Sequence, residues 1–207
     1  MTDELCRPAI GEVQTQSSLL GNWNDKQIQL TVLVPFHFVP GRGRIVTPNN
    51  RRVRIALKAA AGPYRLGIAL HALQDSYSHQ GFTGWEEPLN ACQGWWYLRP
   101  LIPNIGHADM GVWPDVANIK WTDPRSGKLI DNRIRAMQAA KATWKALTKE
   151  EFKLEPFLKE IFLMSYEDRK KALIKKAPVQ RYKKVKGDVE LFIRAARKHL
   201  AIIMDSL

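Results

Sequence analysis

Three side chains that commonly bind metals lie one helical turn apart in LGIALHALQDSYSHQGF, Leu66 to Phe82. They are His71, Asp75 and His79. At about 100° and 1.5 Å per residue, these positions share one helix face over about 12 Å. A His and an Asp one turn apart can hold a single ion, as paired histidines do on zinc-protease helices. The spacing predicts one ion at His71 and Asp75 with a second near His79, or an Asp75 carboxylate that bridges two ions.

The remaining histidines favour a metal site. His37 in VPFHFVP and His107 in NIGHADMGVWPD both lie in turn-forming, aromatic surroundings. Only His199, in an amphipathic stretch beside basic residues, has the pattern of an ordinary surface residue. The alternative interpretation is that the helix histidines are core residues and that Asp75 satisfies hydrogen bonds within its own helix.

The stretches LHALQDSYSHQGF, GHADMGVWPD and PFHF together resemble an uncharacterised bacterial family in the clan of zinc-dependent phospholipase C and the single-strand-specific zinc nucleases. The resemblance covers roughly residues 35–115. Members of that clan are all-helical and hold three zinc ions that cleave phosphate esters. The resemblance therefore implies a zinc ligand set, which comprises His37, His71, Asp75, His79 and His107.

Two departures from the clan's pattern concern the amino-terminal ligands. The clan binds its third zinc through the first residue of the mature chain and a nearby His, whereas no His precedes His37 in this sequence. We therefore expect either that the third site is missing or that the chain begins late relative to its relatives. An upstream Asp normally completes the first zinc site, and Asp25 is the candidate for that role.

A third departure concerns the downstream ligand. The clan's motif is His-x-x-x-Glu, but Gly111 stands four residues after His107. Asp115 or Asp109 would have to substitute, and we expect Asp115, because the turn-forming sequence WPD can direct its carboxylate back to the site. The sequence thus predicts one or two zinc ions, with Asp75 and Asp115 as catalytic carboxylates that orient a water or accept its proton.

The elements that must position these residues are mainly helical. Apolar residues at spacings of three and four predict helices over about 52–61 and 63–79, the second with Pro63 in its first turn. Helical periodicity returns in DNRIRAMQAAKATWKALTKEEF, EPFLKEIFLM and DVELFIRAARKHLAIIMDSL. The only strand candidate is Ile28 to Phe38, which is apolar and β-branched.

The expected fold is an all-α single domain over 1–207, a helical bundle around the ligand-bearing helix. Its expected parts are an irregular amino-terminal segment (1–50), core helices with the metal motif (51–82), a long loop region (84–131) and carboxy-terminal helices (131–207). The loop region is rich in Gly, Pro and Trp, and we expect it to pack over the central helix as an ordered loop or several short helices. With 207 residues, 45% of them hydrophobic, the chain can bury one core.

The formal charge of +12 indicates either a solvated basic surface or an anionic partner, such as a phosphate-ester substrate or a nucleic acid. The charge is concentrated in segments 41–54 and 169–187. Candidate substrate-binding cations are Arg42, Arg44 and Arg65. Candidate residues for stacking or lining a cleft are Trp85, Trp95, Trp96, Tyr97, Trp113 and Trp121.

No stretch has the pattern of a secretory signal or a transmembrane segment, so a cytoplasmic location is the expectation. Cys6 and Cys92 are expected to be free thiols. The oligomeric state is left open. Three functions compete: a zinc-dependent hydrolase of phosphate esters, a non-catalytic protein with a structural or vestigial zinc, and a basic nucleic-acid or interaction module without metal.

Overall fold

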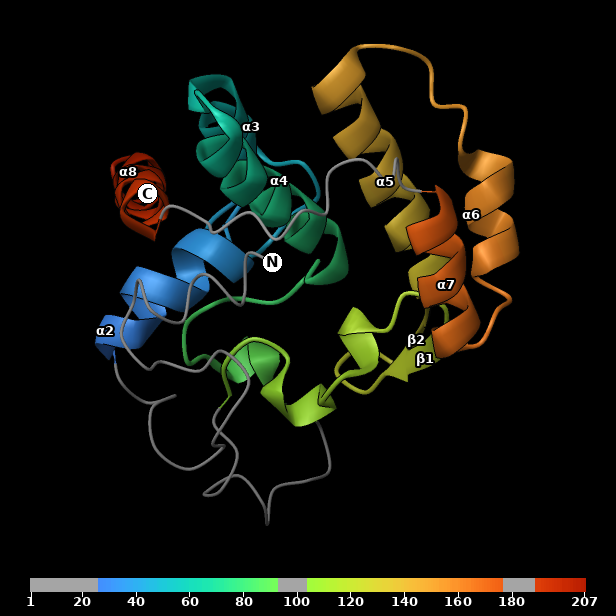
Figure 1. Cartoon of the computed structure of the whole chain (residues 1–207). Helices are drawn as coiled ribbons and strands as arrows, with labels where there is room; N and C mark the ends of the chain where they lie inside the picture. The colour runs from blue at the N-terminus through green and yellow to red at the C-terminus, as the bar shows by residue number, and fades with distance from the viewer. Residues whose placement is uncertain (1–25, 93–103, 177–188) are drawn as a thin grey trace.

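Figure 1 shows the computed structural model, which describes residues 26–92, 104–176 and 189–207. This part of the chain is mainly helical, as expected, and also contains one small sheet. Its α-helices are α2 (Lys26–Ile28), α3 (Arg51–Ala59), α4 (Pro63–Ser78), α5 (Asn132–Thr148), α6 (Glu155–Ile161), α7 (Tyr166–Lys176) and α8 (Val189–Met204). The other elements are a wide helix η1 (Gln29–His37), short turns η2 (Pro88–Asn90), η4 (Ala108–Met110) and η5 (Trp113–Asp115), and strands β1 (Lys120–Asp123) and β2 (Lys128–Asp131).

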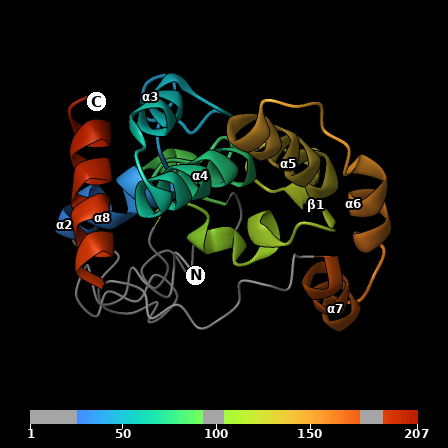
Figure 2. The ribbon, with the colours of Figure 1, turned by 45° about the horizontal axis from the view of Figure 1, so that its top comes forward.

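Helix α4 lies at the centre of the described fold, and α3, α5, α8 and η1 all pack against it (Figures 1 and 2). It begins after Gly62, whose φ of +81° suits glycine, with Pro63 in its first turn. The apolar side of α4 places Ala72 and Leu73 in a core cluster with Val53 from α3 and Ile203 from α8. Helices α3 and α4 agree with the predicted ranges to within two residues at each end.

The strand expected over residues 28–38 is wrong, because this segment forms the end of α2 and then η1. Its backbone follows a wide turn in which the amide of Phe38 donates to the carbonyl of Leu33 at 2.8 Å, a spacing of five residues. Val34 lies next to Gly84, Phe36 packs in a cluster with Phe192, and both side chains are buried. An apolar run that is buried all round lacks the period that separates strand from helix, and β-branched content misled the prediction.

The loop region 84–131 contains a β-hairpin that the sequence reasoning missed. Strands β1 and β2 are antiparallel, with Trp121 opposite Ile130. In the connection, the carbonyl of Asp123 accepts from the amides of Ser126 and Gly127, and Gly127 has a φ of +67°. The sequence DPRSG between two short alternating runs was therefore a hairpin signal.

Elsewhere in the loop region, the described residues 84–92 and 104–119 include the short helical turns η2, η4 and η5, which agrees with the expected alternative of several short helices. Its apolar side chains Ile105, Met110 and Trp121 join a core cluster with Leu33 and Phe82. The region therefore packs chiefly on η1 and on the chain that follows α4. Helices α5, α6 and α8 lie in the predicted stretches. Helix α7 overlaps the start of the basic segment 169–187, and the sequence pattern did not predict a helix there.

The expectation that His199 is a surface residue is also wrong. Its side chain is only 3% exposed, and its Nε2–H donates to the carbonyl of Pro35 at 2.8 Å. The ring also lies 5.1 Å from that of Phe36. The carbonyls at a helix end lack hydrogen-bond donors within the helix, and His199 from α8 supplies a donor for one such carbonyl of η1. Burial lowers the pKa of His199 to about 4, so the buried imidazole is neutral at pH 7.

Candidate metal centre

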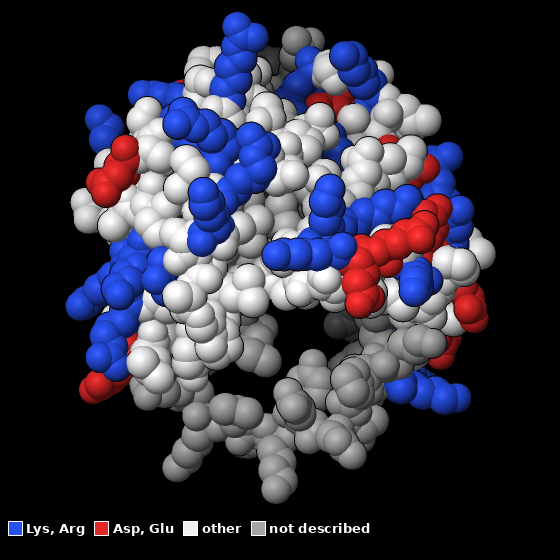
Figure 3. Space-filling model, turned by 90° about the horizontal axis from the view of Figure 1, so that it is seen from above, with Lys and Arg blue, Asp and Glu red and all other residues white. Residues whose placement is uncertain are grey.

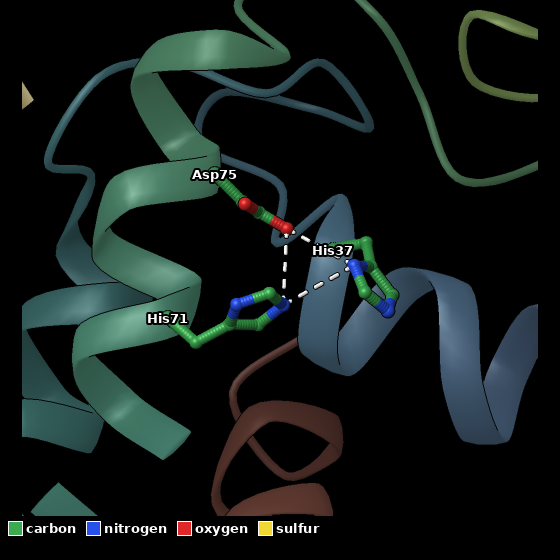
Figure 4. A group of neighbouring side chains, drawn as sticks. All are labelled: His37, His71 and Asp75. Carbon is green, nitrogen blue, oxygen red and sulfur yellow. Dashed lines mark hydrogen bonds and ion pairs between the residues drawn. The ribbon is translucent and has the colours of Figure 1, made fainter. Parts of the chain in front are cut away.

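The first ligand group consists of His37, His71 and Asp75 (Figure 4). His37 is the last residue of η1, and the other two lie one turn apart on the face of α4 that η1 covers. Oδ2 of Asp75 lies 3.0 Å from Nδ1 of His37 and 3.3 Å from Nε2 of His71. The two imidazole nitrogens are 3.3 Å apart. Three ligand atoms from two separate segments therefore face one point.

These distances fit a tetrahedral zinc ion. Zinc binds His nitrogen and carboxylate oxygen at about 2.0–2.2 Å, and two ligands of a tetrahedral ion at that distance are about 3.3 Å apart. The three separations in the first group are 3.0, 3.3 and 3.3 Å. The donor set of two His and one Asp also suits zinc. In the first group, the exposed fractions of the side chains are 15–17%.

The second ligand group consists of His79, His107 and Asp115, whose ligand atoms all lie within 4.8 Å of one another. Nε2 of His79 is 3.0 Å from one carboxylate oxygen of Asp115, and Nε2 of His107 is 3.4 Å from the other. His79 directly follows α4, while His107 and Asp115 come from the loop region. The side chain of Asp115 is 50% exposed, in contrast to 6% for that of His79.

Backbone carbonyls orient both imidazoles of the second group. Nδ1–H of His79 donates to the carbonyl of His37 at 2.8 Å, and Nδ1–H of His107 donates to the carbonyl of Gly111 at 2.8 Å. A carbonyl can only accept, so in each ring Nε2 is the nitrogen left to face Asp115. Histidine ligands in metalloproteins are usually held in this way through their other ring nitrogen.

His37 connects the two ligand groups. Its imidazole belongs to the first group, and its backbone carbonyl orients His79 in the second. Asp75 lies between the groups as well, with Oδ2 3.8 Å from Nδ1 of His79. The geometry therefore places His71 and Asp75 in one group of side chains and His79 in the other. Asp75 contacts the nitrogen of His79 that faces away from Asp115, which does not favour a bridging carboxylate.

The aspartates and histidines of the two groups stabilise one another's charged forms. Burial by itself would raise the pKa of Asp75, but the imidazoles of His79, His71 and His37 outweigh it and hold the pKa well below its usual range. Burial would lower the pKa of His79, yet Asp75 and Asp115 raise it to about 9. Burial would also raise the pKa of Asp115, but the hydrogen bond from His79 and the charges of His107 and His79 together lower it. Both carboxylates are thus ionised and can act as ligands at neutral pH.

The pKa of His107 is shifted in the opposite direction from that of His79. Burial, reinforced by the charge of neighbouring His79, lowers its pKa. A neutral imidazole is the form that binds a metal, so His107 is ready to act as a ligand at neutral pH. A proton on His79 balances the carboxylates of Asp75 and Asp115, and a divalent ion in the second group would take the place of that proton.

All six residues selected from the sequence as ligands lie in these two groups. Asp109 does not, because its Oδ2 accepts from the amide of Cys92, which is a buried free thiol. Arg44 pairs with Glu87 at 2.7 Å and lies over the ring of Trp85. Among the other selected residues, Asp25, Cys6, Trp95, Trp96 and Tyr97 lie outside the described residues.

Sequence reasoning missed the residues that hold the second group in place. Asn132, at the start of α5, is buried and binds backbone carbonyls of the Trp113–Val116 turn. Arg135 donates from Nη1 to the carbonyl of Ser78, the residue before His79. A polar residue after an Asp at a helix start has the pattern of a helix cap, so only the three-dimensional contacts distinguish Asn132.

Comparisons with known proteins show a family and no activity. Within the described residues, no helix is long and apolar enough to span a membrane. No curated protein and no solved structure matches the chain. Residues 6–184, most of the sequence, match the family of unknown function DUF6765. The chain therefore belongs to the family of unknown function DUF6765.

Proposed function

We propose that this protein is a zinc-dependent hydrolase of phosphate esters. The observation that carries the proposal is the pair of neighbouring ligand groups, each with two histidines and one aspartate. The resemblance of the surrounding motifs to the zinc-dependent phospholipase C and zinc nuclease clan supports the same reaction class. In this proposal His37, His71 and Asp75 hold one ion, and His79, His107 and Asp115 hold another.

Zinc bound in such a site lowers the pKa of a water to about 7 and polarises a phosphoryl oxygen. Asp75 serves as a ligand, because three imidazoles surround it and keep its carboxylate ionised. Asp115 has a half-exposed side chain, so it can also orient a water and accept its proton. The remaining catalytic contribution of the chain is to hold these groups in place before substrate arrives.

The solvent exposure of the two ligand groups favours an enzyme over a structural zinc. A structural zinc is usually enclosed by four protein ligands, whereas catalytic sites supply three and keep one position for water or substrate. Each group among the described residues offers three. The side chains of the first group are 15–17% exposed and that of Asp115 is 50% exposed, which supports access from solvent.

The charge of the molecule suits an anionic substrate. Among the described residues on the face seen in Figure 3, Lys and Arg side chains cover more of the surface than Asp and Glu side chains do. Helix α3 alone carries Arg51, Arg52, Arg54 and Lys58 and no acidic residue. A positive field of this kind raises the local concentration and the association rate of phosphate esters, and it is weakened by salt.

The second candidate is a structural role for zinc. Only the second group favours this role, because its His107 and Asp115 belong to the loop region and its His79 follows the central helix. An ion there would tie an irregular segment to α4, as structural zincs do in small domains. This alternative predicts that zinc raises thermal stability and that no phosphodiester is hydrolysed.

The test compares Asp75→Asn with Asp109→Asn and the parent protein. The first change keeps the size of a proposed ligand and removes its charge, and the second makes the same change at an aspartate outside both groups. Zinc content is measured by mass spectrometry of the purified proteins, and activity with bis(p-nitrophenyl) phosphate. We expect the parent and Asp109→Asn to bind zinc and hydrolyse the ester, and Asp75→Asn to lose both properties.

Three outcomes separate the candidates. If zinc and hydrolysis are the same in Asp75→Asn as in the parent, the hydrolase proposal fails. If the parent binds zinc, loses thermal stability on chelation and hydrolyses no ester, the structural role is correct. If the parent binds no zinc, both are wrong and the basic module without metal is the remaining function.

A further inference from the structure

The side chain of Asn132 holds the turn that presents Asp115. Asn132 is 2% exposed, and its Nδ2 donates to the carbonyls of Trp113 at 2.7 Å and Val116 at 3.0 Å, with that of Pro114 at 3.4 Å. These carbonyls belong to the turn around Asp115. Buried carbonyls need partners, and one amide group supplies them for this whole turn.

The opposite side of the same amide is also occupied. Oδ1 of Asn132 accepts from Nε1 of Trp121 at 3.0 Å. The indole nitrogen can only donate, so it requires the oxygen of the amide, and Nδ2 must then face the carbonyls. The backbone amide of Asn132 in turn donates to the carbonyl of Ile119 at 3.0 Å. The orientation of the amide is thus determined by its partners.

The first turn of α5 also holds the other half of the second ligand group. Arg135, three residues after Asn132, donates from Nη1 to the carbonyl of Ser78 at 3.1 Å. Ser78 ends α4 and precedes His79. One helix end therefore binds the backbone beside His79 and the backbone around Asp115, whose ligand atoms lie 3.0 Å apart.

We propose that Asn132 is a positioning residue for the second metal site: it holds Asp115 at the distance from His79 that an ion requires. This inference rests on the proposed function, in which the second group binds zinc. Ligand constellations must be held to within about 0.5 Å, so the support of a ligand matters as well as the ligand. Changing such supporting residues typically weakens metal binding about 10- to 100-fold.

The test uses Asn132→Asp with Trp121→Phe as the matched control. Asn132→Asp keeps the shape and an oxygen for the indole of Trp121, but it removes the donors to the turn carbonyls. Trp121→Phe removes the hydrogen bond on the other side of the amide and leaves both donors. Zinc affinity and stoichiometry are measured by titration against a competing chelator, and fold by circular dichroism.

We expect the parent and Trp121→Phe to bind two ions. Asn132→Asp should bind the first ion as the parent does and the second about 10- to 100-fold more weakly. When cobalt is used in place of zinc, the absorption spectrum of the ion at the first site should be the same in Asn132→Asp as in the parent. Asn132→Ser, which keeps one donor on a shorter side chain, should also weaken the second site and replaces Asn132→Asp if that variant does not fold.

Two results would overturn the inference alone. One is a parent with two ions and an Asn132 variant with two ions of unchanged affinity. The other is an equal loss of the second ion in Asn132→Asp and Trp121→Phe, which would show general loosening of the region. A parent that binds no ion overturns the proposed function and the inference together.

Discussion

Replacing His199 by Gln should remove a specific sensitivity of the fold to acid. Nε2–H of His199 donates to the carbonyl of Pro35, and a Gln amide can make the same bond without titrating. Burial lowers the pKa of His199 from its ordinary value of 6.5 to about 4. Between these pH values the imidazole is therefore protonated in the unfolded chain but neutral in the folded chain, so acid favours unfolding.

The size of the effect follows from proton linkage. A tenfold difference in proton affinity between the folded and unfolded states corresponds to about 1.36 kcal/mol. A fall of the pKa from 6.5 to about 4 then makes about 3 kcal/mol of the unfolding free energy depend on pH. This contribution is fully present above about pH 6.5 and is lost as the pH falls toward 4.

The assay is urea unfolding of the parent and His199→Gln, followed by circular dichroism at several pH values between 7 and 4, with a chelator present in all samples. The unfolding free energy of the parent should fall by about 3 kcal/mol more than that of the variant over this range. Other titrating groups are common to both proteins and cancel in the difference. Parallel curves for the two proteins would show that His199 is protonated freely in the folded state, and the argument from its burial would be refuted.

Three further predictions concern the metal centre and the core. The pKa of His79 is raised to about 9 in the metal-free protein, so zinc binding to the second group at pH 7 should release about one proton. Calorimetry in buffers of different ionisation enthalpy measures this proton release. No released proton would show that the imidazole of His79 was already neutral. Leu73 is 1% exposed in the core cluster of α4, so Leu73→Ala should lower the unfolding free energy by about 2–5 kcal/mol in urea titrations; a change under 1 kcal/mol would contradict tight packing there. Asp123 pairs with Arg125 at 2.8 Å, and the guanidinium also lies 3.6 Å from the centre of the Phe82 ring and donates to the carbonyl of Gly81. Asp123→Asn removes the charge that pairs with this half-buried cation and should lower the unfolding free energy by about 1–3 kcal/mol, whereas an unchanged melting temperature would show that the pair contributes nothing.

The sequence by itself determined the central helix and the face that its His and Asp residues share. His71, Asp75 and His79 follow one another at four-residue spacing, and any α-helix places such residues on one face. Gly62 and Pro63 mark where that helix begins, because a positive φ suits glycine and proline suits a first turn. These are local properties of the chain, and local properties can be predicted from neighbours in the sequence.

The sequence did not determine the structure of segment 28–38. Its apolar, β-branched residues are compatible with a strand and with a helix buried all round, and only packing decides between the two. The core that surrounds Val34 and Phe36 requires the helix. Helical geometry in turn places His37 at the end of η1, with its ring toward α4 and its carbonyl toward His79.

Tertiary structure alone decided which group of candidate ligands His37, His107 and Asp115 each join. His37 joins His71 and Asp75 across 34 and 38 residues of sequence, and His107 and Asp115 meet His79 through a loop region that has no regular period. The contacts of Asn132 and the burial of His199 were decided in the same way, by carbonyls of distant segments that needed a donor. Hydrogen-bond partners far apart in the chain leave no periodic pattern in it, and a sequence therefore reveals the residues able to do chemistry sooner than the residues that hold them in place.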